Sequence, residues 1–522
     1  KSRWIFKVKY NADSTIEKFK ARVVLKGFEQ KYGTDYINTY APTLHLKSLK
    51  LMLAIVAILN LEMYQIDYTT AFLNAPIEEN LFMEQPDGFV QLPANGSTDV
   101  KDRLVCRLVK SLYGAKQAPH NWHKMVHTFM LSLGFKSLIS DSCVYVKRSG
   151  TGKLFLISLY VDDKVICFHK ADTKEWNTLL ATIQSKFKIE VKGECTWILQ
   201  MAITRNREQK TLYLSQHKYV MEVVDRFSYL FDKDDKGKPR IKSRLNPTGS
   251  KKIQLADEDG KVITPSNADI KVYQEIIGSL IYAATHTRID IAQATALLAR
   301  YTANPQPHHL TAVLRVLEYL HTFPDMALVF KGDASTDKNV GTTDHIKMTV
   351  GAYSDADWAG CLDTRRSTTG SIIILNGNVI HWSSHKQSTV ATSSTESEYM
   401  ALAETAKELK WFNHWLSELL MVVPDEFELT KPSTIKVDNT AAIALTNSGA
   451  SHNRTKHIDV RYHFIKEQVV NGTITMVWTP TTLQLADLLT KQLPKETFTK
   501  LVSQLMVRLS SIQVADKSRN NG

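Results

Sequence analysis

Residues 156–168 read LISLYVDDKVICF, and this stretch limits the possible folds more than any other in the chain. Almost every position is apolar, as in a buried β-strand, yet Asp162 and Asp163 lie side by side in its middle. A buried carboxylate costs several kcal/mol unless a partner compensates for its lost hydration. A surface turn with two solvated acids is the alternative, but the apolar residues on both sides argue against it. The run therefore predicts two acids held within the fold by a counter-charge.

Asp67, in MYQIDYTTAFLNAP, is a third acid on an apolar strand. Three acids on neighbouring strands raise one another's pKa values unless cations lie between them. Two Mg²⁺ ions would supply this charge, with Mn²⁺ as an alternative, because such ions bind carboxylate and phosphate oxygens and support phosphoryl transfer. Neighbours on a strand point to opposite faces, so Asp162 is the surer ligand of its pair. By the same alternation Lys164 would share the face of Asp162 and compete with a metal ion.

The composition restricts the partners of the chain. Among 522 residues, 65 Lys and Arg outnumber 53 Asp and Glu, giving a net charge of +12 that favours polyanions such as nucleic acid. Five cysteines without a C-x-x-C pair argue against a disulfide framework or zinc ribbon and indicate a reducing compartment. The longest apolar run, residues 51–59, is too short to cross a bilayer, and no signal peptide is visible. The chain starts at Lys1 without a Met, so we expect a fragment of a longer polyprotein.

Hydrophobic patterning predicts the organisation of the first half. Two strands, residues 3–10 and 19–28, flank the polar turn NADST and form a hairpin with a cationic face. A buried helix is expected at 46–61, an amphipathic helix from residue 120 ending at Gly134, and a second hairpin around RSGTGK at 148–153. Polar stretches at 232–266 and 332–346 mark boundaries, with two helical segments between them.

The last part of the chain predicts three strands, a helix, a strand, two helices, a strand and a final helix, which is an α/β arrangement with a mixed sheet. A second set of acids lies on these elements. Asp355 is on a strand, Glu398 on a helix, Asp438 at a strand end and Asp487 at a helix start. Such acids meet only in a folded site, where they again require two divalent ions. Asp357 and Glu396 are the alternative members.

Several sequence blocks resemble a known family. YVDD at 160–163, QIDYTTAFLNAP, SLYGAKQAPHNWH and KFKARVVLKGFEQKYGTDYINTYAPT are similar to the polymerase of copia-type LTR retrotransposons. SDADWAG, RRSTTG, ATSSTESEYMAL, KHIDVRYHFI and ADLLTK are similar to the ribonuclease H fused to it. The resemblance covers nearly the whole chain. It implies an α+β right-hand polymerase with fingers, palm and thumb, followed by an α/β ribonuclease H-like domain with a mixed sheet.

The resemblance also implies domain limits and site residues. Fingers and palm would occupy residues 1–230, thumb and connection 231–345, the ribonuclease H-like domain 346–508, and a flexible tail 509–522. The implied catalytic and Mg²⁺-binding residues, with two ions in each site, are Asp67, Asp162 and Asp163 in the first site and Asp355, Glu398, Asp438 and Asp487 in the second. The implied nucleotide-binding residues are Lys20 and Arg22 on the triphosphate, Phe72 against the ribose, and Tyr113 and Gly114 beneath the nucleotide. A solvated strand face for Lys20 and Arg22, and a core position for Phe72, are the alternatives.

The chain departs from the family pattern at Ala115, His120 and Lys164, and in GECTWILQ, which lies where the family has its primer-contacting hairpin. The loop TPTTLQLAD also lacks the histidine that many ribonucleases H carry, so that role is missing or falls to the KHIDVRYH region. These departures leave a rival open: a decayed copy that folds and binds nucleic acid without catalysis.

The histidines and tryptophans have simpler interpretations. No cysteine accompanies the spacings that could suggest zinc, so structural or nucleic-acid-facing roles are expected for His381, His385, His452, His457 and His463. The side chains expected in the core are Trp382, Trp411 and Trp415.

The function expected from this resemblance is RNA-directed DNA synthesis coupled to degradation of the RNA strand of the resulting hybrid. Expected partners are an RNA template, a DNA primer, RNA–DNA hybrid and dNTPs, without a membrane; a homodimer or association with other Pol products is left open. The resemblance implies a cytoplasmic location in virus-like particles, with nuclear entry left open. A standalone ribonuclease is the remaining alternative.

Overall fold

The computed structural model describes residues 1–10, 15–97, 99, 103–249, 252–332, 346–447 and 459–512. The chain forms two compact units. Unit 1 consists of Lys1–His45 and Glu62–Glu194, and unit 2 consists of Leu46–Leu61 and Cys195–Gly522. The domain limits expected after residues 230 and 345 divide the chain differently and stay predictions.

Unit 1 is built on a six-stranded sheet with the strand order β10-β3-β9-β8-β7-β6, accompanied by the two-stranded sheets β1-β2 and β4-β5. Its strands are β1 (Ser2–Tyr10), β2 (Ile16–Leu25), β3 (Glu62–Tyr68), β4 (Phe82–Glu84), β5 (Val105–Arg107), β6 (Lys136–Ser137), β7 (Val144–Arg148), β8 (Leu154–Tyr160), β9 (Asp163–Phe168) and β10 (Ile189–Glu194). Its helices are α2 (Ala118–Ser132) and α3 (Thr173–Lys186).

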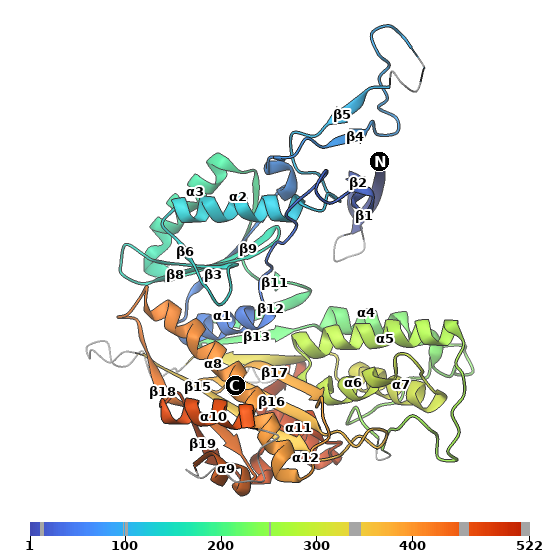
Figure 1. Cartoon of the computed structure of the whole chain (residues 1–522), viewed down its shortest axis with the longest axis vertical. Helices are drawn as coiled ribbons and strands as arrows, with labels where there is room; N and C mark the ends of the chain where they lie inside the picture. The colour runs from blue at the N-terminus through green and yellow to red at the C-terminus, as the bar shows by residue number, and fades with distance from the viewer. Residues whose placement is uncertain are drawn as a thin grey trace, which may run out of the picture. The chain divides into compact units, whose positions relative to one another are not determined.

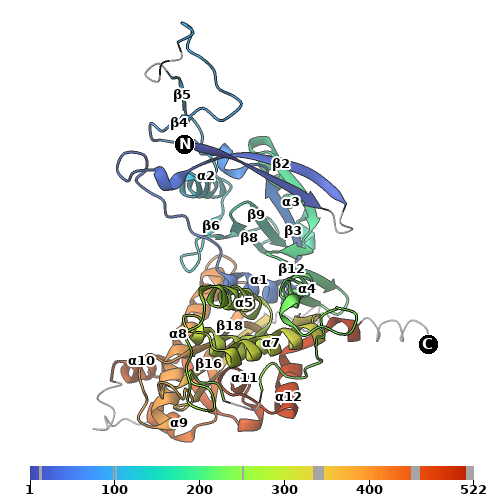
Figure 2. The ribbon, with the colours of Figure 1, turned by 90° about the vertical axis from the view of Figure 1, so that its right-hand side faces the viewer.

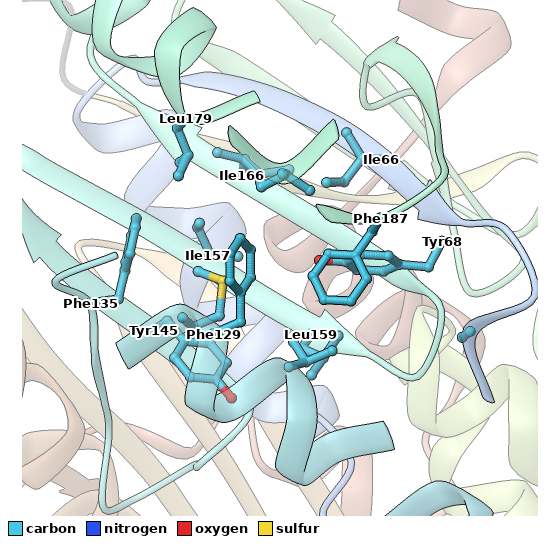
Figure 3. Close-up of a cluster of buried hydrophobic side chains, with 14 of the residues drawn as sticks. Ile66, Tyr68, Phe129, Phe135, Tyr145, Ile157, Leu159, Ile166, Leu179 and Phe187 are labelled. Atoms are coloured by element: carbon cyan, nitrogen blue, oxygen red, sulfur yellow. The ribbon is translucent and has the colours of Figure 1, made fainter. Parts of the chain in front are cut away.

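The core of unit 1 lies between the six-stranded sheet and helices α2 and α3 (Figure 3). Apolar residues recur at helical spacing in both helices, so each presents one buried face to the sheet. Phe129 of α2 and Tyr68 of β3 both pack edge-to-face on Phe187, with centroid distances of 5.2 Å. This packing fixes the end of β3 on which Asp67 lies.

The expected local signals of unit 1 are found. Strands β1 and β2 pair antiparallel, although the turn residues 11–14 lie outside the described ranges. The amphipathic helix is α2, and the chain leaves it through Gly134 at φ +83°, a left-handed conformation that favours glycine. The RSGTGK segment joins β7 to β8 as a hairpin.

Unit 2 contains a mixed five-stranded sheet, β17-β16-β15-β18-β19, and a second five-stranded sheet, β11-β12-β13-β14-β20. The strands are β11 (Trp197–Ile198), β12 (Met201–Asn206), β13 (Thr211–Ser215), β14 (Met326–Lys331), β15 (Ile346–Asp357), β16 (Thr368–Leu375), β17 (Asn378–Lys386), β18 (Phe427–Val437), β19 (Ile474–Trp478) and β20 (Met506–Arg508). The helices are α1 (Leu46–Ile58), α4 (His217–Arg226), α5 (Asn267–His286), α6 (Ala292–Leu298), α7 (Pro307–Thr322), α8 (Ser394–Leu420), α9 (Thr440–Asn447), α10 (Asp459–Val470), α11 (Asp487–Thr490) and α12 (Lys495–Leu505).

The mixed sheet follows the order of elements expected from the sequence. Strand β15 pairs antiparallel with β16 and parallel with β18, and the long helix α8 packs on β15, β16 and β18 (Figure 1). Helices α4, α5 and α7 lie side by side in another part of the unit (Figure 2). The sheet therefore brings the strand ends that carry Asp355 and Asp438 next to each other.

Helix α1 is buried almost throughout, as its continuous apolar run predicts, and it packs on β13, β14 and β17. Its Lys50 ammonium donates a hydrogen bond to the Thr285 carbonyl at 2.8 Å and lies 3.4 Å from the centre of the Trp382 ring. Near the C-terminus, backbone hydrogen bonding continues past β20, because the Leu509 amide donates to the Asp325 carbonyl. Residues 513–522 lie outside the described ranges. Across the described ranges no helix combines the length and apolarity needed to cross a membrane.

Candidate active sites

The acid pair lies at a hairpin turn, with Asp162 in the turn and Asp163 as the first residue of the following strand. Tyr160 of β8 pairs with Asp163 of β9, and Val161 and Asp162 form the connection between the two strands. Val161 has φ +53°, a left-handed conformation that is rare for a β-branched residue and costs about 1–3 kcal/mol. The expectation of two acids in the middle of a strand was therefore wrong, because the apolar run folds back on itself at this point.

Two hydrogen bonds hold the strained turn in place. The indole Nε1 of Trp122 donates to the Val161 carbonyl at 2.8 Å, and the Tyr68 amide donates to the Asp162 carbonyl at 3.1 Å. Trp122 is itself buried in the core of unit 1. The core thus determines where the Asp162 carboxylate projects.

We call Asp67, Asp162 and Asp163 the first acid cluster. Asp67 of β3 is the register partner of Asp163 on β9. The ammonium of Lys192 lies 2.8 Å from Asp67 Oδ2 and 3.4 Å from Asp163 Oδ1. Lys192 projects from a register irregularity between Val191 and Gly193, where β10 pairs with β3. The structure thus brings the predicted acids together and adds a lysine between two of them, which sequence reasoning missed.

Asp162 is the most strongly perturbed acid of this cluster. Burial, followed by the negative charges of Asp67 and Asp163, raises its pKa to about 6, while Arg22 and Lys20 act in the opposite direction. Its Oδ1 atom is buried and accepts no hydrogen bond from the described residues. A buried acceptor oxygen without a donor, beside two further carboxylates, fits a divalent cation.

Lys164 does not compete for this position. Its side chain is fully buried in the core of unit 1, where its ammonium donates to the Tyr68 hydroxyl at 2.5 Å and lies 3.4 Å from Met130 Sδ. Burial lowers the pKa of Lys164 to about 7. The expectation that Lys164 shares the face of Asp162 was wrong, because Asp162 lies in the turn and the strand alternation begins only after it.

The expected nucleotide-binding residues gather beside the first acid cluster. Lys20 and Arg22 alternate on β2 and both act electrostatically on Asp162. The Arg22 guanidinium lies 5.2 Å from the centre of the Tyr113 ring, and this ring lies 4.9 Å from that of Phe72. Tyr113 and Phe72 thus form a continuous aromatic floor next to the cations.

Gly114 anchors this group to β2. The Leu25 amide donates to the Tyr113 carbonyl at 2.8 Å, and Gly114 adopts φ +89°. A Cβ atom added at Gly114 would lie 2.1 Å from the Leu25 carbonyl oxygen. No side chain fits there without a backbone shift, so glycine lets the strand with Lys20 and Arg22 approach the aromatic floor.

We call Asp355, Glu398, Asp438 and Asp487 the second acid cluster. Each of Asp355, Asp438 and Asp487 offers a ligand atom, and these atoms all lie within 4.8 Å of one another. They come from β15, from the residue after β18 and from the first residue of α11. Among the described residues this is the only group of three potential ligands that could hold a metal ion at such mutual distances.

Glu398 and Glu396 of helix α8 face different surroundings. The Ala356 amide donates to the Glu398 carboxylate. The other carboxylate oxygen, Oε2, is buried and has no donor among the described residues. Burial, followed by the negative charges of Asp355 and Asp438, raises the pKa of Glu398 to about 9. The Glu396 carboxylate instead accepts hydrogen bonds from the amide and hydroxyl of Thr392 at the helix start. Of the two residues, Glu398 acts electrostatically on the other acids.

A lysine also joins the second acid cluster. The ammonium of Lys491 lies 2.6 Å from Asp487 Oδ1 and 3.3 Å from Asp355 Oδ1, and the Thr490 hydroxyl donates to the other oxygen of Asp355. Burial lowers the pKa of Lys491, but the charges of Asp355 and Asp487 outweigh this effect and raise it. Lys491 was missed as well, although its i+4 spacing from Asp487 on one helical turn is readable from the sequence.

The remaining histidines and tryptophans lie away from both acid clusters or outside the described residues. His381 approaches Glu408 at 3.9 Å, His385 bonds to Ser383, and neither belongs to a possible metal site among the described residues. His452 and His457 lie outside the described ranges. Of the tryptophans, Trp382 and Trp415 are buried, whereas Trp411 is half-buried beneath the Lys47 ammonium at 3.9 Å.

Comparison with known sequences shows which proteins this chain resembles. Residues 1–242 match the family described as reverse transcriptase (RNA-dependent DNA polymerase). The chain is 36% identical over 502 residues to the retrovirus-related Pol polyprotein from transposon TNT 1-94 of Nicotiana tabacum, an alignment that covers 95% of this chain and 35% of that protein. It is 34% identical to the corresponding polyprotein from transposon RE1 of Arabidopsis thaliana, covering 97% of this chain and 31% of that protein. Over most of its length the chain is similar to Pol polyproteins of copia-type retrotransposons. It spans about a third of the length of these relatives.

Solved structures show more distant similarity. The ribonuclease LC11-RNase H1 is 19% identical with a TM-score of 0.21, covering 29% of this chain and 96% of that protein. The foamy viral protease-reverse transcriptase, solved in complex with dsDNA, is 12% identical with a TM-score of 0.16, covering 80% of this chain and 68% of that protein. Scores this low carry no argument about the fold, so the family assignment rests on the sequence matches.

Proposed function

We propose that this Pol segment is an RNA-directed DNA polymerase of the right-hand type that also degrades the RNA strand of RNA–DNA hybrids. The observation that carries the proposal is that seven acids, widely separated in sequence, gather into two clusters within separate folded units. Buried acids at this density are electrostatically costly, and a fold retains them where their charge has a use. The family matches support a nucleic-acid enzyme, and the clusters indicate which residues act.

The first acid cluster is the proposed polymerase site. A primer 3′-hydroxyl attacks the α-phosphate of a dNTP there, and pyrophosphate leaves. Lys20 supplies a point charge and Arg22 a forked hydrogen-bond donor to the triphosphate. Phe72 packs against the sugar, where its ring excludes a ribose 2′-hydroxyl, and Tyr113 supports it from below.

The second acid cluster is the proposed ribonuclease site, where water attacks a phosphate of the RNA strand. Asp355, Asp438 and Asp487 are close enough to share a cation, and Glu398 brings a further carboxylate from α8. Thr490 and Lys491 hold two of these acids in place. The RNA strand would be recognised by its 2′-hydroxyls in the shallow minor groove.

The carboxylates of both clusters fit Mg²⁺ chemically, because each cluster includes a buried oxygen that accepts no hydrogen bond from the described residues. Of the two, only the second cluster has three ligand atoms within 4.8 Å of one another among the described residues. When bound, such ions activate the attacking oxygen and stabilise the leaving oxygen in phosphoryl transfer.

The direct test measures two activities on one protein preparation. Primer extension on poly(rA)/oligo(dT) and cleavage of a labelled RNA–DNA hybrid are followed in the unmodified chain and in Asp162→Asn and Asp355→Asn. We expect each substitution to abolish one activity and to spare the other. Loss of neither activity, or of both in each variant, would contradict the proposal.

A decayed copy that binds nucleic acid without catalysis is the competing function. Lys164 was its main sequence support, and the burial of this side chain away from the acids removes that support. Ala115 is also buried, within the small hydrophobic cluster that contains Leu25. Hybrid binding without either activity in the unmodified chain would favour the decayed copy.

A further inference from the structure

A cavity of about 710 Å³ lies within unit 2 beside the second acid cluster. Residues from two separate stretches of the chain, 246–315 and 357–495, form its walls. Its lining carries one acid, Asp357, and five cationic side chains, which are Lys252, Arg300, Arg315, Lys491 and Lys495. The lining therefore carries more positive than negative charge, although it adjoins the second acid cluster.

Four of these cations form no ion pair at contact distance with a described carboxylate. Among the described residues, only Lys491 of the five forms an ion pair with an acid. The Arg300 guanidinium donates to the Thr368 hydroxyl at 2.9 Å, and the Arg315 guanidinium donates to the Asn246 side-chain oxygen at 2.7 Å. Neutral acceptors of this kind balance no charge, and only Asp357 near Lys252 and Arg300, and Glu318 near Arg315, offset part of it electrostatically.

Two buried donors of the same lining also lack an acceptor. Arg315 Nε and Gln492 Nε2 are both buried, and neither donates a hydrogen bond to any described residue. A buried donor left unsatisfied has lost its hydrogen bond to water without gaining another. Burial and the positive charge of Arg244 lower the pKa of Arg315, and the charge of Glu318 offsets only part of this effect. An anion with several acceptor oxygens would satisfy both donors.

The cavity is continuous with the acid cluster through two residues. Thr490 and Lys491 line the cavity and also contact Asp355 of the cluster. Asp357, two residues after Asp355 on β15, lines it as well, and the charges of Lys252 and Arg300 act on Asp357. A strand held at the acids therefore has a positively charged site immediately beside it.

We propose that this cavity binds a backbone phosphate of the nucleic acid whose neighbouring phosphate lies at the second acid cluster. The proposal rests on the proposed ribonuclease function. Arginine donors match the tetrahedral oxyanion of a phosphodiester, and the lysines at the rim contribute point charges. Binding of this kind does not depend on base sequence, and it sets the register of the strand at the cleavage site.

The test uses the full chain and hybrid duplexes. Binding is measured by fluorescence anisotropy in EDTA across a range of salt concentrations. Lys252→Gln/Lys495→Gln removes two exposed rim charges that make no ion pair with a described residue, and Arg315→Met removes the half-buried guanidinium with its buried Nε. Lys500→Gln is the matched control, because Lys500 is an exposed lysine on the same helix as Lys495 and does not line the cavity.

We expect the double variant to bind the hybrid about fivefold to tenfold more weakly at low salt and to lower the slope of log K against log salt by about 1–2. Arg315→Met should show a similar loss, while Lys500→Gln should bind as the unmodified chain does. Normal affinity and slope in both cavity variants, with hybrid cleavage intact, would overturn this proposal and leave the proposed function standing. Absence of hybrid cleavage in the unmodified chain would instead overturn the proposed function.

A neutral phosphate analogue distinguishes backbone phosphate from free phosphate. Single methylphosphonate linkages are placed in turn near the cleavage site. At one position the analogue should weaken binding to the unmodified chain as much as the double substitution does, and should not weaken binding to the double variant further. Free phosphate gives a different pattern. Inorganic phosphate would then raise the unfolding temperature of the unmodified chain but not of the double variant, and each methylphosphonate would weaken binding equally in both proteins. That pattern would show that the cavity binds free phosphate and that the backbone assignment is wrong.

Discussion

The two acid clusters use the same electrostatic arrangement at different depths. In the first, the side chains of Asp67 and Asp163 are 33% and 30% exposed and Lys192 lies between them. In the second, Asp355 and Asp487 are 1% and 6% exposed, and Lys491 joins them. A lysine thus neutralises a pair of acids in both units, but only the second pair is shielded from water. The second cluster should therefore depend more on each of its charges, because screening by solvent weakens the first.

The largest expected effect separates the clusters by activity. Asp355→Asn should lower hybrid cleavage by more than about a hundredfold, because loss of a proposed metal ligand should cost more than the roughly 10–100-fold typical of losing a residue that only supports a ligand. Primer extension by the same protein should change little. Asp162→Asn should give the reverse pattern, so each variant is the control for the other in parallel gel assays.

Phe72 tests the nucleotide end of the first cluster. Phe72→Ala removes the ring that packs at 4.9 Å on Tyr113, so a ribose 2′-hydroxyl should no longer be excluded. We expect the preference for dNTPs over rNTPs to fall by about 10–200-fold, the range over which steric contacts discriminate. The ratio of kcat/KM for dTTP and UTP measures it, and an unchanged ratio would place Phe72 in the core alone.

Lys164 tests the core beneath the first cluster. The buried lysine is charged in the unfolded chain but has a pKa near 7 in the folded chain, so folding expels protons and stability should rise between about pH 7 and pH 10. Lys164→Met should raise the free energy of unfolding at pH 7 by about 2 kcal/mol and flatten this pH dependence. Urea unfolding at pH 7 and pH 10 gives both quantities; destabilisation at neutral pH would show that the bonds to Tyr68 and Met130 outweigh the cost of burial.

The smallest effects compare the two lysines directly. Without metal, Lys491→Met should destabilise unit 2 by about 1–2 kcal/mol, and Lys192→Met should destabilise unit 1 by less than about 1 kcal/mol. Added Mg²⁺ should recover more stability in each variant than in the unmodified chain, because it replaces the missing charge. Thermal unfolding with and without Mg²⁺ measures this, with Lys136→Met and Lys500→Met as exposed controls; equal losses at both sites would show that depth of burial does not matter.

The sequence predicted the elements better than their connections. The acids of both clusters, the buried helix α1 and the order of helices and strands along the last part of the chain were readable from hydrophobic period and residue type. The hairpin turn at Asp162 was not, because Val161 has a left-handed φ that its residue type disfavours and only tertiary bonds stabilise. The error propagated to Lys164, whose predicted face depended on unbroken alternation.

Other features depended on contacts between distant segments. Lys192 projects from a register irregularity that no local pattern shows, and helix α1 joins unit 2 although its neighbours in sequence belong to unit 1. The positive cavity combines residues from either side of a long stretch of chain, so charge counting along the sequence could not locate it. The roles proposed for the acids remain predictions that the experiments above test.

The most direct test of the account is a manganese-soaked crystal of the chain, examined by anomalous scattering. We predict manganese beside Asp162 in the first cluster and between Asp355, Asp438 and Asp487 in the second, with Asp162→Asn removing only the former. A map without manganese at either cluster, in crystals of protein that still extends primers and cleaves hybrid, would contradict the claim that these acids are held together to bind divalent cations.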